Sequence, residues 1–385
     1  MPPAANGGKI RQTAIQRRDI EGIVMMRPTQ GVNRRRILAG GAAGLAALGM
    51  PTILRAAEKT LKVGVYGGFF KDSFDKHIFP EFTKATGIAV ESIAEPTGEA
   101  WLVQLSQAAR AGVAPADVSM MSQTALLKGE AGDLWAPLDL GQMKNTANLV
   151  ERFVNKYPDG RVAGIGAVSW YITLVTNTKA FPEAPTSWAA LWDPANKDKL
   201  GLLALVSNSF LLEVTAATFF GGTKALDDEA GQLKAFEKLA EVKPNVKLWY
   251  RDEAQFEQAL KSGEIPMGQY YHDVTGLAAA DGHPVRSTFP KEGGILDSGS
   301  WAVSRASKAL DEAHVFINYM CQPEIQALMS RKVGTSPTVR RDLLDLTDAE
   351  FAAVSSDIPP IVPRYDLYLS RADWLNQKWT EMIVG

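Results

Sequence analysis

The sequence predicts an α/β protein divided into two lobes, and three observations carry this prediction. Between Leu61 and Met121, segments that favour strands alternate with segments that favour helices, as in a sheet covered by helices. A second strand, helix and strand are expected within 246–271. The chain has 385 residues, which is more than one ordinary hydrophobic core holds, so two lobes are the default expectation.

The first strand is expected at Leu61–Tyr66, where apolar and polar residues alternate, and Gly67-Gly68 then turns the chain. A helix follows because apolar side chains recur at helical spacing, and Gly87 stops it. Its apolar face consists of Phe70, Phe74, Ile78, Phe79 and Phe82. The next elements are a strand at 89–94, a helix at 99–111 and a strand at 117–121.

The middle of the chain begins with an extended segment, Arg161–Asn177, which has Trp170-Tyr171 at its centre. This pattern fits a strand that crosses between lobes and equally an ordinary core strand. Ser187 caps a short helix at 188–192. The further elements are a strand at 199–206, helices at 210–220 and 227–240, a Gly-rich stretch at 292–301, and a helical segment at 311–329 that Pro323 is expected to interrupt.

The segment from Lys247 to Asp273 concentrates polar and aromatic side chains at strand ends. Strands are expected at 246–250 and 265–271, with Asp252 as N-cap of the helix between them, and such a crossover makes a parallel pair. Ligands bind beyond the carboxyl ends of parallel strands. The residues at these ends are Arg251, Tyr270, Tyr271 and Asp273. We expect this rim to hold a small polar molecule, and it contains no evident catalytic machinery.

The composition is that of a globular protein, with 46% apolar and 22% charged residues and a net charge of −2. Residues 1–57 hold nine of the 41 basic and two of the 43 acidic residues, so the remainder carries a net charge of −9. This acidic remainder argues against nucleic acid as a partner. With Cys321 as the one cysteine, no intrachain disulfide or cysteine-based metal site is possible, and we expect no cofactor.

The N-terminal 57 residues read as an extension followed by a twin-arginine signal peptide. Asn33–Leu38 contains three consecutive arginines, an apolar run continues to Leu54, and Arg55-Ala56-Ala57 forms a weak cleavage site. We expect export by the twin-arginine machinery to the periplasm, with cleavage near Ala56/Ala57. The alternative is an uncleaved membrane anchor, for which the glycines and Pro51 make a poor spanning helix.

Four segments together resemble one family. They are Phe82–Val90 (FTKATGIAV), Pro185–Pro194 (PTSWAALWDP), Phe316–Ala327 and Gly334–Thr338 (GTSPT). In their order and spacing they are similar to the solute-binding proteins of ABC importers, and most similar to the spermidine/putrescine-binding branch. The matches extend from residue 61 to about 340 and so cover most of the chain that follows the signal.

The resemblance implies a two-lobed periplasmic-binding-protein fold of type II, in which two α/β lobes joined by extended crossovers close on a ligand like a flytrap. It implies discontinuous lobes, the first made of 58–168 and 300–345 and the second of 169–299 and 346–385. It also implies a monomer without enzymatic activity, which captures a small-molecule solute in the cleft and delivers it to permease subunits at the inner membrane.

The chain departs from the spermidine/putrescine type at the ligand. The Trp and Asp that follow the motif "E-G-G-I" in that branch fall here on Asp297 and Gly299, which leaves Trp301 as the aromatic cover, if there is one. Arg251 would repel a diamine and suits a carboxylate, while Asp273 could take an amine. We therefore expect an amino acid derivative, an ω-amino acid or another carboxylate first, and a polyamine second.

Most candidate ligand contacts also have an ordinary structural explanation. The candidates are Tyr66, Phe69, Gln123, Trp170, Ser207, Ser209, Arg251, Tyr270, Tyr271, Asp273, Asp297, Ser300 and Trp301. Arg251 could instead pair with Asp252 or Glu253, and Asp273 could cap the helix that follows it. The aromatic residues could be core residues, Gln123 could lie beside a helix cap, and the serines could serve turns.

Two other functions remain open. Ferric-ion-binding members of the same superfamily use adjacent tyrosines at this strand end, as Tyr270-Tyr271 would allow. A thiaminase-like enzyme related to these proteins uses a cysteine nucleophile in the cleft. Cys321, however, lies in a segment whose other residues are typical of a core.

Overall fold

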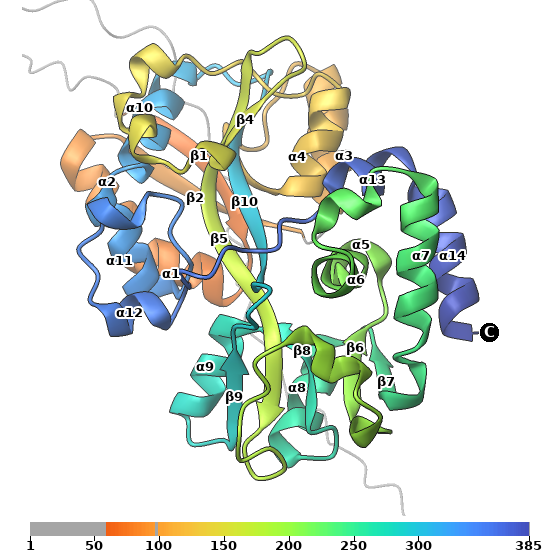
Figure 1. Cartoon of the computed structure of the whole chain (residues 1–385). Coiled ribbons are helices and arrows are strands. Elements are labelled where there is room, and N and C mark those ends of the chain that lie inside the picture. Colours follow the sequence, from red (N-terminus) through yellow and green to blue (C-terminus); the bar gives the residue numbers. More distant parts are fainter. Residues whose placement is uncertain (1–58, 97–98, 385) are drawn as a thin grey trace, which may run out of the picture. The chain divides into compact units, whose positions relative to one another are not determined.

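A computed structural model describes residues 59–96 and 99–384 (Figure 1). The predicted signal at 1–57 lies outside the described residues. In the described part, ten strands form one mixed sheet in the order β2-β1-β3-β10-β5-β8-β6-β7, and β4 and β9 each pair with β5. No helix of this part is both long and apolar enough to cross a membrane.

The first third of the described chain confirms the predicted alternation of strands and helices. Its elements are β1 (Thr60–Tyr66), α1 (Phe69–His77), α2 (Phe79–Thr86), β2 (Ala89–Glu95), α3 (Glu99–Arg110), β3 (Val118–Ser122) and α4 (Gln123–Ala131). The single helix expected after Gly68 is wrong, because the chain breaks at Ile78 and restarts with Pro80 in the first turn of α2. Proline lacks the N–H that a continuing helix needs, and it is well tolerated in a first turn.

The middle of the chain supplies most of the sheet. Its elements are β4 (Val154–Lys156), β5 (Val162–Asn177), β6 (Leu200–Leu203), α5 (Val206–Ser209), α6 (Leu211–Phe219), α7 (Glu229–Ala240), β7 (Val246–Tyr250), α8 (Glu253–Ser262), β8 (Met267–Tyr271), α9 (His272–Ala280), β9 (Val285–Thr288) and β10 (Ile295–Val303). Three further helices are α10 (Leu310–Met320), α11 (Pro323–Val333) and α12 (Asp348–Ala352), and the chain ends with α13 (Tyr365–Ser370) and α14 (Ala372–Val384). The predicted interruption before Pro323 is confirmed.

Short 3-10 helices occupy several connections. They are Leu140–Gln142, Lys144–Asn148, Glu151–Phe153, Trp188–Trp192, Pro194–Asn196, Thr223–Leu226, Lys243–Asn245 and Arg341–Leu343. The helix predicted at 188–192 is thus present as a 3-10 helix, with the Ser187 side chain accepting from Ala189 N–H as its cap.

β5 and β10 join two parallel groups of strands into one sheet. β1 pairs in parallel with β2 and β3, and β6 pairs in parallel with β7 and β8. β10 is antiparallel to both β3 and β5, and β5 is antiparallel to β8. The two groups are therefore continuous through this central pair, which runs through the middle of Figure 1. The register of β10 against β5 shifts between Gly299 and Ser300.

The expected direct pairing of the strands at 246–250 and 265–271 is wrong. β7 and β8 are both parallel to β6, which lies between them. β6 was itself predicted, as part of the strand at 199–206, but its place between β7 and β8 was not, because it lies far upstream of the strand–helix–strand segment. The carboxyl ends of all three strands still share one edge of the sheet, because the strands run in the same direction.

Two large clusters of buried apolar side chains form the core. The first core cluster takes its residues from 61–168 and 301–339, and the second core cluster from 172–295 and 361–382. β5 contributes Val168 to the first and Ile172 to the second. The described residues nevertheless belong to one compact unit. The last two helices, α13 and α14, pack in the second core cluster, far in sequence from the strands that they cover.

Candidate functional site

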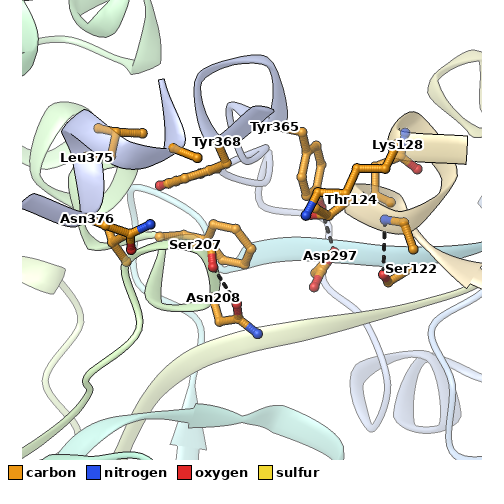
Figure 2. A pocket seen from close by; sticks show the side chains of 15 residues that line it. Ser122, Thr124, Lys128, Ser207, Asn208, Asp297, Tyr365, Tyr368, Leu375 and Asn376 are labelled. Atoms are coloured by element: carbon orange, nitrogen blue, oxygen red, sulfur yellow. Dashed lines mark hydrogen bonds between the residues drawn. The ribbon is translucent and has the colours of Figure 1, made fainter. Parts of the chain in front are cut away.

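A cavity of about 390 Å³ lies where helix ends from four parts of the chain meet β10 (Figure 2). This volume lies within the range of pockets that hold small molecules. Its lining residues are Ser122, Gln123, Thr124, Ala125, Lys128, Val206, Ser207, Asn208, Phe210, Asp297, Tyr365, Tyr368, Ala372, Leu375 and Asn376.

One wall of the cavity is the amino-terminal end of α4. β3 ends at Ser122, whose hydroxyl accepts a 3.4 Å hydrogen bond from Ala125 N–H and so caps the helix. The first N–H groups of a helix and its dipole together favour negative charge. Lys128, one turn further along α4, also lines the cavity. This wall therefore suits an anionic group.

The wall contributed by α5 carries neutral polar groups. Ser207 donates a 2.8 Å hydrogen bond to the Asn208 side chain, and both residues line the cavity. Phe210 then adopts a left-handed backbone with φ of 51° and separates α5 from α6. That conformation is costly for a bulky residue, so the surrounding packing must hold it in place.

Asp297 on β10 is the acidic group of the cavity. Its Oδ1 accepts a 2.6 Å hydrogen bond from the Tyr365 hydroxyl and a 2.8 Å hydrogen bond from Ser298 N–H. Burial raises the pKa of Asp297 to about 6, although both hydrogen bonds act in the opposite direction. The carboxylate is therefore ionised at neutral pH and is poorly solvated, which favours pairing with a cation.

Three of the predicted site residues line this cavity: Gln123, Ser207 and Asp297. The Gln123 amide is already used, since it donates a 2.7 Å hydrogen bond to the Asn155 side chain. Ser207 beside Asn208 on α5 and Asp297 on β10 both line the space drawn in Figure 2.

Two more predicted residues share the sheet face of Asp297. Trp170 is the direct partner of Asp297 across β5 and β10, and Tyr271 lies opposite Ile172, two residues along β5 from Trp170. Directly paired residues in a sheet project to the same side, as do residues two apart along a strand. Trp170 and Tyr271 are outside the lining of the cavity but are directed to its side of the sheet.

The two candidates at the end of β1 differ in exposure. Tyr66 packs edge-on against Phe70, with 5.7 Å between ring centroids, and its buried hydroxyl has no hydrogen-bond partner among the described residues. Phe69, at the start of α1, is 61% exposed. Neither lines the cavity.

The rim that follows β7 and β8 lies outside the cavity lining. Arg251 is exposed on the bend after β7, and Tyr271 donates a 2.9 Å hydrogen bond to the Glu253 carboxylate. Asp273 lies in the first turn of α9, and its Oδ1 is buried without a hydrogen-bond partner in the described part of the chain. Burial raises the pKa of Asp273 to about 6.

Four predicted contacts have buried side chains and lie outside the lining of the cavity: Ser209, Tyr270, Ser300 and Trp301. Trp301 shares its strand with Asp297 but lies four residues, about 13 Å, further along it. There it packs edge-on against Phe74 and Phe316, at 6.1 and 5.0 Å between centroids.

The three other buried contacts are used inside the protein. The Ser300 hydroxyl accepts a 3.0 Å hydrogen bond from Asn155, and the Ser209 hydroxyl bonds locally to the backbone of Val206 and Leu211. Tyr270 packs against Phe256 at 5.6 Å between centroids, with its hydroxyl 3.4 Å from the Glu253 carbonyl.

The surroundings of Tyr270, Tyr271 and Cys321 disfavour iron binding and nucleophilic catalysis, the two alternative functions. Iron binding requires tyrosinate, and burial raises the pKa of both Tyr270 and Tyr271 above the ordinary value. Among the described residues no group of three or more His, Cys, Asp or Glu could hold a metal ion. Cys321 is fully buried in the first core cluster, and burial raises its pKa to about 12, so the thiol is a poor nucleophile.

The sequence reasoning did not identify the contribution of the C-terminal helices. Tyr365 and Tyr368 of α13 and Asn376 of α14 line the cavity, although they follow Asp297 by more than sixty residues. A signal was present in the Tyr-x-x-Tyr spacing, which places both rings on one face of a helix. Nothing local indicated which surface that face covers.

Comparison with known proteins identifies a family match for most of the chain. Residues 77–353 match the model of the bacterial extracellular solute-binding proteins. A spermidine/putrescine-binding periplasmic protein of Haemophilus influenzae is 27% identical, over 77% of this chain and 79% of the relative. A gamma-aminobutyric acid-binding protein of Pseudomonas aeruginosa is 26% identical, over 74% of this chain and 78% of the relative.

Solved structures agree with this assignment of the fold. An ABC transporter substrate-binding protein from Bradyrhizobium japonicum superposes with a TM-score of 0.70 at 21% identity, covering 84% of this chain and 99% of that structure. A binding protein of Agrobacterium tumefaciens in complex with agropinic acid gives 0.63 at 24% identity, covering 85% and 99%. The predicted two-lobed α/β fold is therefore confirmed.

Proposed function

Because the chain belongs to the family of bacterial extracellular solute-binding proteins, we propose that it captures a small amine-bearing solute for an ABC importer. The solute would bind in the cavity at Asp297 and pass from there to permease subunits at the inner membrane. The named relatives support a periplasmic location, since several are called periplasmic binding proteins. They are transport proteins, which supports a role without catalysis.

The proposed lobes are those expected from the sequence, 58–168 with 300–345 and 169–299 with 346–385. The division of the buried side chains into two core clusters supports these boundaries. The cavity combines residues from both proposed lobes, such as Ser122 of the first and Ser207 of the second. Closure of one lobe on the other would enclose the solute, as hinge motion does in binding proteins.

The observation that carries the proposal is the arrangement of Asp297. One carboxylate oxygen is held by Tyr365 and Ser298, and the other has no hydrogen-bond partner among the described residues. An ammonium group would donate a hydrogen bond to this second oxygen and would balance the negative charge of the carboxylate. Spermidine, putrescine and gamma-aminobutyric acid, which appear in the names of the relatives, all carry an ammonium group on a short aliphatic chain.

We propose an ω-amino acid as the preferred solute rather than a diamine. Lys128 and the amino-terminal end of α4 form a wall that favours a carboxylate, opposite to Asp297 in charge. Arg251, exposed on the rim after β7, supplies a second cation that lobe closure could bring to the same carboxylate. A second ammonium would be repelled by both groups.

Calorimetric titration of the full chain with gamma-aminobutyric acid, putrescine and spermidine tests this proposal. We expect saturable binding of gamma-aminobutyric acid at one site, weaker binding of the two polyamines, and an affinity reduced about 100-fold in Asp297→Asn. Binding of polyamines alone would reverse the order of solutes. Retention of the full amine affinity in Asp297→Asn would remove this cavity as the site.

We also propose export through the twin-arginine machinery, with removal of residues 1–57. The twin-arginine motif at Arg34–Arg36 and the net basic charge of this segment support the proposal. N-terminal sequencing of protein recovered from the periplasm is expected to begin near Glu58. An intact N-terminus on cytosolic protein would contradict it.

A further inference from the structure

The orientation of Asp297 depends on α13, a helix from the far end of the chain. Tyr365 and Ser298 both donate to Oδ1, at 2.6 and 2.8 Å. Two bonds to one oxygen fix the rotation of the carboxylate. The second oxygen, Oδ2, is thereby left to face the cavity that Asp297 lines (Figure 2).

A buried carboxylate on α6 in turn holds α13. Glu213 has no exposed surface, and its two oxygens accept hydrogen bonds from Arg364 N–H at 2.8 Å and from the Tyr368 hydroxyl at 2.7 Å. Both partners belong to the first turns of α13 or to its N-cap. A buried carboxylate is strongly unfavourable when unpaired, so this contact fixes the position of the helix.

Phe210 and Arg364 reinforce the same turn. The Phe210 ring packs edge-on against Tyr365 and Tyr368, with centroids 6.1 and 5.8 Å apart. The Arg364 guanidinium bonds to Asp227 at 2.6 Å and to Asp366 at 2.8 Å. Phe210 also ends α5, the helix that carries Ser207. The same ring therefore supports both the α5 wall of the cavity and Tyr365, which binds Asp297.

We propose that Tyr365 is a positioning residue that turns Oδ2 of Asp297 into the cavity, and that Glu213 acts through α13 to keep Tyr365 in place. This inference rests on the proposed function, since it concerns the group that would hold the solute's ammonium. Tyr365 binds Asp297 and Tyr368 binds Glu213, and the two tyrosines lie three residues apart on one face of α13. The carboxylate that would hold the solute and the buried carboxylate that holds the helix are therefore linked through α13.

The decisive variant is Tyr365→Phe, which removes one hydroxyl and keeps the ring. The titration of Asp297 is followed by carboxyl NMR in the absence of solute, and solute binding is measured at several pH values. Loss of the donor destabilises the ionised carboxylate, so we expect the Asp297 midpoint to rise by about one pH unit. We expect affinity for gamma-aminobutyric acid at pH 7 to fall about fivefold.

The groups that face Asp297 must be considered in this titration. Tyr66 from β1, Tyr271 from β8 and Tyr365 itself surround the carboxylate, and burial raises the pKa of all three phenols. Lys128 from α4 lines the same cavity. The phenols stay protonated through the range in which Asp297 titrates, so the measured midpoint belongs to Asp297.

Tyr368→Phe is the matched control, because it removes the same group from the same helix but releases Glu213 instead of Asp297. We expect a lower melting temperature and a shift of the Asp297 midpoint much smaller than in Tyr365→Phe, because Glu213 keeps its bond to Arg364 N–H. Glu213→Ala is expected to weaken solute binding several-fold, and Glu213→Gln, which keeps one acceptor oxygen, to restore part of it.

Each outcome decides the inference. An Asp297 midpoint that stays unchanged in the folded Tyr365→Phe variant overturns the positioning role. Equal midpoint shifts in Tyr365→Phe and Tyr368→Phe overturn it also, because the effect would then be a general loosening of α13. A shifted midpoint in a protein that binds neither gamma-aminobutyric acid nor putrescine leaves the positioning role standing and refutes the proposed function alone.

Discussion

The cavity at Asp297 and the rim after β7 and β8 are built in different ways. The rim is local, since one strand–helix–strand segment carries Arg251, Tyr271 and Asp273. The cavity is assembled from β3 and α4, α5, β10, and the C-terminal helices α13 and α14. Its acidic group is held by a tyrosine 68 positions further along the chain.

The difference shows which kind of site a sequence can predict. The rim follows from strand ends and charge, and a reader of the sequence finds it at once. The cavity depends on where α13 packs, and the contacts that place α13, such as those of the buried carboxylate of Glu213, come from distant parts of the chain. The rim, which is easier to predict, is therefore not where the cavity lies.

The largest expected effect separates the two regions directly. Asp297→Asn removes the charge that pairs with an ammonium, and truncating one side of a partly buried charge pair costs several kcal/mol. We expect the affinity for gamma-aminobutyric acid to fall about 100-fold, corresponding to about 2.7 kcal/mol. Calorimetry on wild type and variant measures it. A loss below threefold would place the ammonium elsewhere, with the rim as the first alternative.

The pH dependence sharpens the same comparison. The pKa of Asp297 is raised to about 6, so its ionised fraction is high at pH 7 and falls about tenfold by pH 5. The solute's amine stays protonated in this range. We therefore expect affinity to fall about tenfold between pH 7 and pH 5. Constant affinity over this range would exclude a carboxylate with this pKa as the anchor.

Arg251→Ala tests whether the rim takes part. An exposed cation contributes little until it is enclosed with its partner, so we expect about a fivefold loss for gamma-aminobutyric acid and no loss for putrescine. Lys128→Ala provides the matched comparison on the cavity wall. An unchanged affinity for the carboxylate solute in Arg251→Ala would remove the rim from the site.

The smallest expected effect on solute affinity is that of Asp273→Asn, whose main effect is on stability. Burial raises the pKa of Asp273 to about 6, above its unfolded value, so the folded state binds the proton more tightly and wild-type stability decreases as pH rises from about 4 to about 6. We expect the variant to be more stable than wild type at pH 7, by at most about 3 kcal/mol, with the difference vanishing near pH 4. Melting temperatures at both pH values measure this.

Solute affinity in the same variant completes that test. We expect Asp273→Asn to leave the affinity for gamma-aminobutyric acid unchanged. An affinity loss as large as that of Asp297→Asn would return the amine to the rim.

Local sequence patterns predicted the elements well where a turn or a proline marks their ends. β1, β2 and β3 lie within a residue or two of their predicted positions, and Pro323 divides two helices as expected. Pro80 was overlooked as a breaker, because the phenylalanine stripe continues across it. β6 was expected to reach Val206 but ends at Leu203, because α5 begins at Val206.

The site was predicted only in part, for physical reasons. Asp297 was found because the Gly-rich segment before it resembles a known motif. Trp301 packs against Phe74 and Phe316 instead of lining the cavity, because a strand's alternation predicts the face of a side chain but not the helices that cover it. Tyr365 was not found because its partner is set by long-range packing, which no local pattern encodes.

The register shift between Gly299 and Ser300 has a mechanical consequence. It lies two residues from Asp297, on one of the two strands that pass from the first core cluster to the second. A strand bends locally where its ladder is interrupted. If the proposed lobes swing about this point, an anchor beside it would move least. The solute would then stay bound to Asp297 until its contacts with the rest of the cavity are lost. Release at the transporter would therefore begin with those other contacts.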